Sequence, residues 1–275
     1  MSGKIPGKQA RLPLKSLKLP KKARRAGQAT RRVKFASITQ ITNTILAMPK
    51  TNAIERRNRA LIAFTLLSGA RDGAIISMNL GHVDLDGKEV LQHPDEVNTK
   101  ASKQIFTWFF PVGDQIIEEV ENYILFLKTE LGFTNEDPLF PSTLIGQDEN
   151  DRFKSRGLTK KRWSSAQPMR NIFKAAFKHN DLPYYNPHSF RNTLMALAQE
   201  LKLPPEEIKA WSQNLGHEKL DTSFNSYGNL SPDRQRSVIL GLHNKPKPDD
   251  EDMRPMLFRD FKAMLDSGKL TINPD

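Results

Sequence analysis

The sequence predicts an α+β protein that is mostly helical and contains one small antiparallel three-stranded sheet. Apolar residues recur at helical spacing along most of the chain. Residues from about 83 to 112 differ, because they form short runs of strand-favouring residues separated by turn signals. With 275 residues, the chain is long enough to bury a substantial core.

Two helices are expected before the strands. The first begins after Ser37, a favourable N-cap residue, and ends at Pro49, with its isoleucines on one face. The second runs from about residue 52 to residue 67 and stops at Ser68-Gly69.

The strand region contains Asp86-Gly87, a hairpin turn signal, and an aromatic-rich run at residues 105–110. Helical patterns then return at about 114–131, 164–179, 188–201, 204–213 and 253–266. We therefore divide the chain into a basic flexible arm or linker (1–35), a main catalytic domain (36–243), a linker (244–252), and a C-terminal helix and tail (253–275).

The distribution of charge indicates a polyanionic partner. The formal net charge is +11, yet 13 of the 42 basic residues precede the first acidic residue, Glu55, and the chain from there on has a net charge of −2. Such an arm gains affinity for nucleic acid by releasing counterions, although a solubilising or targeting tail has the same composition. The arm residues that we select as candidate DNA contacts are Lys21, Lys22, Arg24, Arg25, Arg31 and Arg32.

Composition also excludes several classes of protein. The chain has no cysteine, so it has neither disulfides nor Cys-ligated metal sites. No apolar stretch is long enough for a membrane span, and the basic N-terminus lacks the apolar region of a secretory signal. Walker-A and GxGxxG patterns are missing as well, so we expect no cofactor and no metal.

A few residues have the chemistry needed to handle a phosphate. Arg71 follows a helix end and can donate two parallel hydrogen bonds. His188 and Arg191 share a helix face and can reach the same anion. His217 follows Leu215-Gly216, and Tyr227 comes ten residues later.

Lys100 lies on the hairpin before the aromatic strand and could protonate a leaving oxygen, with Lys103 as the alternative and as a candidate DNA contact. Each residue has a plainer interpretation, namely a surface arginine, a structural histidine, a core tyrosine or a solvated lysine. Leu80-Gly81-His82 repeats the Leu-Gly-His letters at the start of the hairpin, and we interpret it as a decoy.

Taken in order, Arg71, Lys100, His188-x-x-Arg191, Leu215-Gly216-His217 and Tyr227 resemble the signature of the tyrosine recombinases, the phage integrase family. The resemblance covers about residues 36–243 and implies a tyrosine-recombinase-like catalytic fold. The segments at 99–103, 109–112 and 137–141 also resemble one bacterial integrase subgroup.

The resemblance implies a site-specific DNA recombinase that cuts and rejoins strands through a 3′-phosphotyrosine, without metal or ATP. In that reaction the two arginines clamp the phosphate, the two histidines assist, Lys100 is the general acid, and Tyr227 is the nucleophile. The implied partners are double-stranded DNA and further copies of the chain, assembled as a tetramer on paired sites through the helix at 253–266. We expect a cytoplasmic, nucleoid-associated protein of bacterial or phage origin.

Three features depart from the family pattern. Ala74 stands where a glutamate is usual, with Asp72 as a substitute. Tyr227 lies one residue further from His217 than in the commonest pattern. The separate core-binding domain is missing, so we expect a truncated or catalytic-domain-only form. The alternatives are a catalytically degenerate DNA-binding protein or mobile-element remnant, and a type IB topoisomerase.

Overall fold

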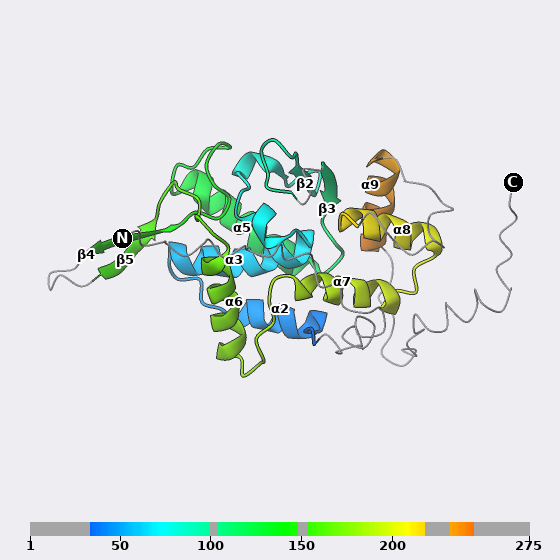
Figure 1. The fold of residues 1–275 in the computed structure, drawn as a ribbon, viewed down its shortest axis with the longest axis horizontal. Coiled ribbons are helices and arrows are strands. Elements are labelled where there is room, and N and C mark those ends of the chain that lie inside the picture. Colours follow the sequence, from blue (N-terminus) through cyan, green and yellow to red (C-terminus); the bar gives the residue numbers. More distant parts are fainter. Residues whose placement is uncertain (1–33, 100–103, 148–152, 218–231, 245–275) are drawn as a thin grey trace, which may run out of the picture. The chain divides into compact units, whose positions relative to one another are not determined.

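A computed structural model describes residues 34–99, 104–147, 153–217 and 232–244 (Figure 1). The helices are α2 (Ile38–Ala47), α3 (Ala53–Ser68), α4 (Asp72–Ile75), α5 (Asp114–Thr129), α6 (Gln167–His179), α7 (Ser189–Glu200), α8 (Pro205–Asn214) and α9 (Pro232–Gly241). The strands are β1 (Val83–Asp84), β2 (Glu89–Gln92), β3 (Ile105–Trp108), β4 (Thr143–Gln147) and β5 (Phe153–Leu158), and 3₁₀ turns occupy Leu80–His82 (η1) and Leu242–Asn244 (η4). The prediction of a mostly helical protein with a small antiparallel three-stranded sheet is therefore confirmed.

Helix α2 begins where the sequence predicts. Ser37 and Gln40 form a reciprocal capping box, in which each side chain accepts a hydrogen bond from the main-chain N–H of the other residue. Ile41 and Ile45 are fully buried on the inner face. The cap and the apolar face together determine where the helix starts and which side packs against the core.

Helix α3 runs through the centre of the fold and is buried on nearly every side. It packs against α2, α5, α6 and α7, so its apolar residues are not confined to one stripe. It ends at Gly69, whose φ of +57° lies in the left-handed region that favours glycine.

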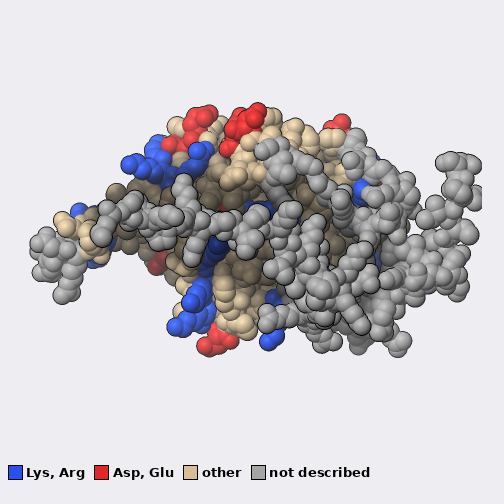
Figure 2. Space-filling model, viewed as in Figure 1, with Lys and Arg blue, Asp and Glu red and all other residues tan. Residues whose placement is uncertain are grey.

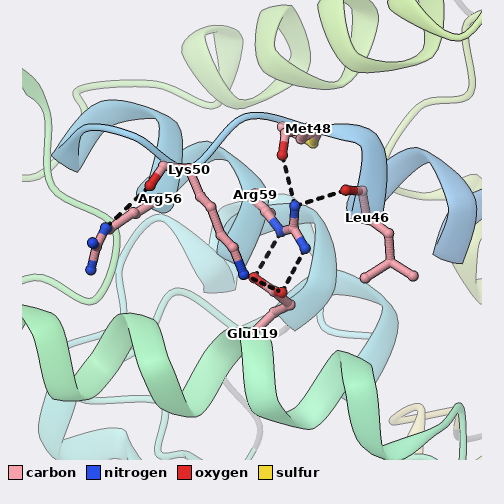
Figure 3. A network of polar contacts seen from close by, with 6 residues as sticks. All are labelled: Leu46, Met48, Lys50, Arg56, Arg59 and Glu119. Atoms are coloured by element: carbon pink, nitrogen blue, oxygen red, sulfur yellow. Dashed lines mark hydrogen bonds and ion pairs between the residues drawn. The ribbon is translucent and has the colours of Figure 1, made fainter.

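A buried arginine joins the first two helices to α5 (Figure 3). Arg59 donates two hydrogen bonds to the carboxylate of Glu119, at 2.7 and 2.6 Å. It also donates to the main-chain oxygens of Leu46 and Met48 at the end of α2. Because these carbonyls have no partner within their own helix, Arg59 completes the C-terminus of α2 while fixing α3 against α5.

The three-stranded sheet has the order β1-β2-β3, and both pairs are antiparallel. The Asp86-Gly87 turn joins β1 to β2 as predicted, and the carboxylate of Asp84 accepts a hydrogen bond from the Gly87 N–H. The aromatic run ends in Trp108, Phe109 and Phe110, which are almost completely buried. The last of these rings packs against Trp211 of α8, with the centroids 4.7 Å apart.

The prediction of a single sheet is wrong, because β4 and β5 form a second, two-stranded antiparallel sheet. This hairpin extends away from the helices (Figure 1). Its residues are mostly exposed, and a bulge interrupts the register between Leu144 and Ile145. Gly146 and Gly157 lie within the strands, so the sequence lacks the apolar alternation by which a half-buried strand is recognised.

Helices α6 and α7 pack through aromatic rings. Phe190 of α7 contacts Phe173 and Phe177 of α6, and Phe177 also contacts Tyr185. This packing holds the start of α7, with its predicted histidine and arginine, against the core. Within the described ranges, no helix has the length and apolar character needed to cross a membrane.

Candidate active site

The first predicted arginine is positioned by the turn that ends α3. A Cβ atom at Gly69 would lie 2.5 Å from Leu215 Cδ2 and 2.9 Å from Leu194 Cδ1, so only glycine fits this turn without displacing neighbours. Arg71 follows two residues later as the N-cap residue of α4 and is half-buried. Arg71 lies close enough to Arg191 of α7 for its positive charge to act on that residue.

The second arginine lies on the first turn of α7. Asn186 caps this helix, because its side-chain oxygen accepts from the Ser189 N–H at 3.0 Å and its main-chain oxygen accepts from the Ser189 hydroxyl. His188 is the N-cap residue, and Arg191 follows one turn later with only 4% of its surface exposed.

Arg191 joins two parts of the chain that are distant in sequence. Its Nη1 donates to the main-chain oxygen of Gly69 and its Nη2 to that of Leu215, both at 2.6 Å. The first acceptor lies two residues before Arg71 and the second two residues before His217. One buried guanidinium group thus brings together the segments that carry three of the predicted catalytic residues.

The Leu215-Gly216-His217 segment is the C-terminal cap of α8. The Gly216 N–H donates to the Gln213 oxygen and the His217 N–H donates to the Ser212 oxygen, a pair of bonds that defines a Schellman motif. Gly216 has a φ of +64°, and a Cβ there would lie 2.9 Å from Ile105 Cδ1. The motif explains the glycine and sets His217 just beyond the helix end.

The two arginines make the site electropositive. Burial, together with the smaller effect of the positive charge of Arg71, lowers the pKa of Arg191 to about 10. Burial also lowers the pKa of Arg71. Both groups remain protonated at neutral pH, and their mutual repulsion would be relieved by an anion placed between them.

On the face drawn in Figure 2, the described Lys and Arg side chains form several small groups, some of them beside acidic residues.

Asp72 forms an ion pair with Arg170 of α6. The Arg170 Nη2 lies 2.6 Å from Asp72 Oδ2, and Asp72 Oδ1 accepts from the Gly73 N–H. Ala74, at the position where the family usually has glutamate, is buried. The carboxylate next to Arg71 is thus fixed by a residue of a different helix.

The second Leu-Gly-His segment, which the sequence analysis interprets as a decoy, forms a 3₁₀ turn at residues 80–82. His82 is buried, accepts a hydrogen bond from the Asn79 N–H and contacts Glu96. Lys100, Lys103, Tyr227, the arm and the helix predicted at 253–266 lie outside the described residues. In the described ranges, no three His, Asp or Glu residues form a group suited to a metal ion.

Sequence reasoning missed three polar residues near the site, namely Arg170, Asn214 and Gln235. Asn214 directly precedes the Leu-Gly-His segment, and its position at the last turn of a helix was the available signal. Gln235 lies in α9, which was not predicted because its sequence is rich in charged and polar residues.

The model of the phage integrase family matches residues 38–234. The chain therefore belongs to the phage integrase family.

Among solved structures, the chain is similar to XerA recombinase, with 14% identity and a TM-score of 0.48 over 79% of this chain and 66% of that one. It is also similar to the integrase from mycobacterium phage Brujita, with 13% identity and a TM-score of 0.47 over 79% of this chain and 61% of that one. The chain thus spans slightly less than two thirds of each. No curated protein sequence matches it significantly.

Proposed function

We propose that the protein is an active site-specific DNA recombinase that cuts and rejoins strands through a covalent phosphotyrosine. The observation that carries this proposal is the Arg191 bridge, because it brings the Arg71, His188 and His217 segments to one buried, positively charged place. Family membership supplies the class of reaction.

In the proposed step, the Tyr227 hydroxyl gives its proton to one of the two histidines, His188 or His217, as its Oη attacks the scissile phosphorus and becomes bonded to it, while the bond from phosphorus to the 5′-oxygen breaks. Lys100 gives a proton to that departing oxygen, which leaves as a 5′-hydroxyl. Arg71 and Arg191 donate hydrogen bonds to the non-bridging oxygens, where negative charge develops. His188 and His217 support the same oxygens and assist in proton transfer.

The bond energy is retained in the 3′-phosphotyrosyl link. A 5′-hydroxyl from a second DNA strand can therefore attack that link, restore the tyrosine and complete the exchange without ATP. We expect positioning and electrostatic stabilisation to supply most of the rate acceleration, and no metal to be needed.

The experiment that tests this proposal is covalent trapping. The full chain is incubated in EDTA with a library of nicked duplexes, denatured, and the protein-bound DNA is sequenced. We expect adducts with the wild type and with Tyr184→Phe, a matched loss of an exposed phenol, but none with Tyr227→Phe. Adducts that persist in Tyr227→Phe would contradict the assignment of the nucleophile.

The buried Ala74 favours one alternative, a DNA-binding protein that has lost catalysis. This alternative predicts a salt-dependent gel shift without any covalent product.

We further propose that the basic arm and Lys103 contact DNA, that the helix at 253–266 assembles copies into a tetramer on paired sites, and that the protein acts on cytoplasmic DNA.

A further inference from the structure

The outer edge of β3 is completed by two side-chain amides instead of a fourth strand. The Asn214 Oδ1 accepts from the Trp108 N–H at 2.7 Å, and its Nδ2 donates to the Trp108 oxygen at 2.8 Å. The Gln235 Nε2 donates to the Phe106 oxygen at 3.0 Å. Because unpaired main-chain groups at a sheet edge are costly to bury, these two amides determine how α8 and α9 sit on the strand.

The two amides also contact each other. Gln235 Nε2 lies 3.3 Å from Asn214 Oδ1. Thr107 extends the network by donating its hydroxyl to the main-chain oxygen of Asn214, while it accepts a hydrogen bond from Gln92. All four residues are at least 96% buried. A connected polar network of this kind specifies one arrangement of its elements.

The position of this network connects it to the candidate active site. Asn214 directly precedes Leu215, whose oxygen holds Arg191, and lies three residues before His217. Gln235 lies on the first turns of α9, eight residues after Tyr227 in the sequence. The chain between His217 and α9 is therefore attached at both ends to elements that meet at the edge of β3.

We propose that Gln235, acting with Asn214, is a positioning residue for DNA cleavage. By fixing α9 to the edge of β3, it fixes the start of α9 relative to Arg191 and His217. The segment that carries Tyr227 is joined in sequence to that start. This inference rests on the proposed function. In this proposal Gln235 does not contact DNA. It acts by holding the main chain of α9 in place.

The test uses single-turnover adduct formation at saturating nicked duplex. In Gln235→Met, the side chain keeps its length but cannot donate to the Phe106 oxygen. We expect the rate of adduct formation to fall about tenfold or more, because small displacements of reacting groups are costly, while DNA affinity stays unchanged. The matched control is Tyr123→Phe, which also removes one buried hydrogen bond to a main-chain oxygen, that of Leu139, on α5 away from the site.

A second substrate separates positioning of the nucleophile from positioning of the general acid. A DNA with a bridging 5′-sulfur at the cleaved bond releases a thiolate, which needs no proton because a thiol has a pKa of about 8.5. The defect of Gln235→Met should persist on this substrate. A defect that the sulfur erases, or a rate equal to that of Tyr123→Phe, would overturn the proposal.

The conservative variant Gln235→Glu provides an independent readout if Gln235→Met fails to fold. A protonated carboxyl group can still donate to the Phe106 oxygen, whereas a carboxylate cannot. Its rate relative to the wild type should therefore fall as the pH rises, and a constant ratio would overturn the proposal. Absence of adducts in the wild type would instead refute the proposed function itself.

Discussion

Arg191 shows how one residue serves both the core and the site. Its guanidinium group donates hydrogen bonds to the main-chain oxygens of Gly69 and Leu215. The i, i+3 spacing of His188 and Arg191 predicts a shared anion site, which stays a prediction. The two carbonyl acceptors could not be predicted, because they are 122 and 24 positions away in the sequence and depend on the tertiary fold.

We predict that Arg191→Lys will be defective in spite of its retained charge. An ammonium group lacks the planar fork that reaches both carbonyls, so the free energy of unfolding should fall by about 2 kcal/mol. The rate of adduct formation should fall about a hundredfold or more, since a transition-state donor is also lost. Thermal unfolding and covalent trapping measure the two effects, and wild-type values for both would show that charge alone suffices.

At the scale of secondary structure, the main helices were predictable because their apolar faces and caps are local. Ser37 begins a helix by its own hydrogen bond, and the prediction needs no tertiary information. The β4–β5 hairpin and α9 were not predictable for the opposite reason. Their residues are largely exposed or polar, and α9 is held by contacts that are distant in sequence, among them that of Gln235 with a strand 129 positions away.

The α4–α6 connection leads to a prediction about Arg170. Its exposed ion pair with Asp72 should add little to stability because solvent screens it, but it holds the turn that carries Arg71. We expect Arg170→Ala to slow adduct formation about fivefold with little change in melting temperature. Lys160→Ala, which breaks a comparable exposed pair with Asp137, is the control.

A salt titration separates this role from direct DNA contact. If Arg170 binds a phosphate instead, its loss should lower the salt dependence of DNA binding by about one counterion. An unchanged slope together with the slower reaction supports the positioning role.

The contact between His243 of η4 and the residue that follows β3 should make the stability of the fold depend on pH. The Nε2 of His243 lies 3.1 Å from the main-chain oxygen of Phe109, and burial lowers the pKa of this histidine. Because the pKa of His243 is lowered in the folded protein, the unfolded chain binds the proton more readily. The contribution of neutral His243 to the free energy of unfolding is therefore fully present above about pH 6.5, the ordinary pKa of histidine. This contribution should decline as the pH falls below about 6.5.

The comparison variant for this prediction is His243→Gln, whose amide can donate to Phe109 but does not titrate. Melting temperatures measured from pH 7.5 to 5.5 should fall less for His243→Gln than for the wild type. Identical slopes would assign the pH dependence to other groups.

For the whole molecule, the distribution of charge leads us to expect that the arm contributes DNA affinity, whereas the candidate active site carries the reaction. The basic excess lies before Glu55, whereas the candidate site uses a few arginines within a part of the chain whose net charge is −2. Deleting residues 1–33 should therefore weaken DNA binding and flatten its dependence on salt, because counterion release scales with phosphate contacts. Fluorescence anisotropy at increasing salt measures both. An unchanged slope would mean that the arm does not contact DNA.

The two left-handed glycines of the site have an evolutionary consequence. Gly69 and Gly216 each pack so closely that even a methyl group would collide, and each adjoins a carbonyl or histidine that the site uses. A side chain at either position is strained by the positive φ as well as by the close packing. We therefore expect substitutions to be tolerated less well at Gly69 and Gly216 than in the exposed β4–β5 hairpin.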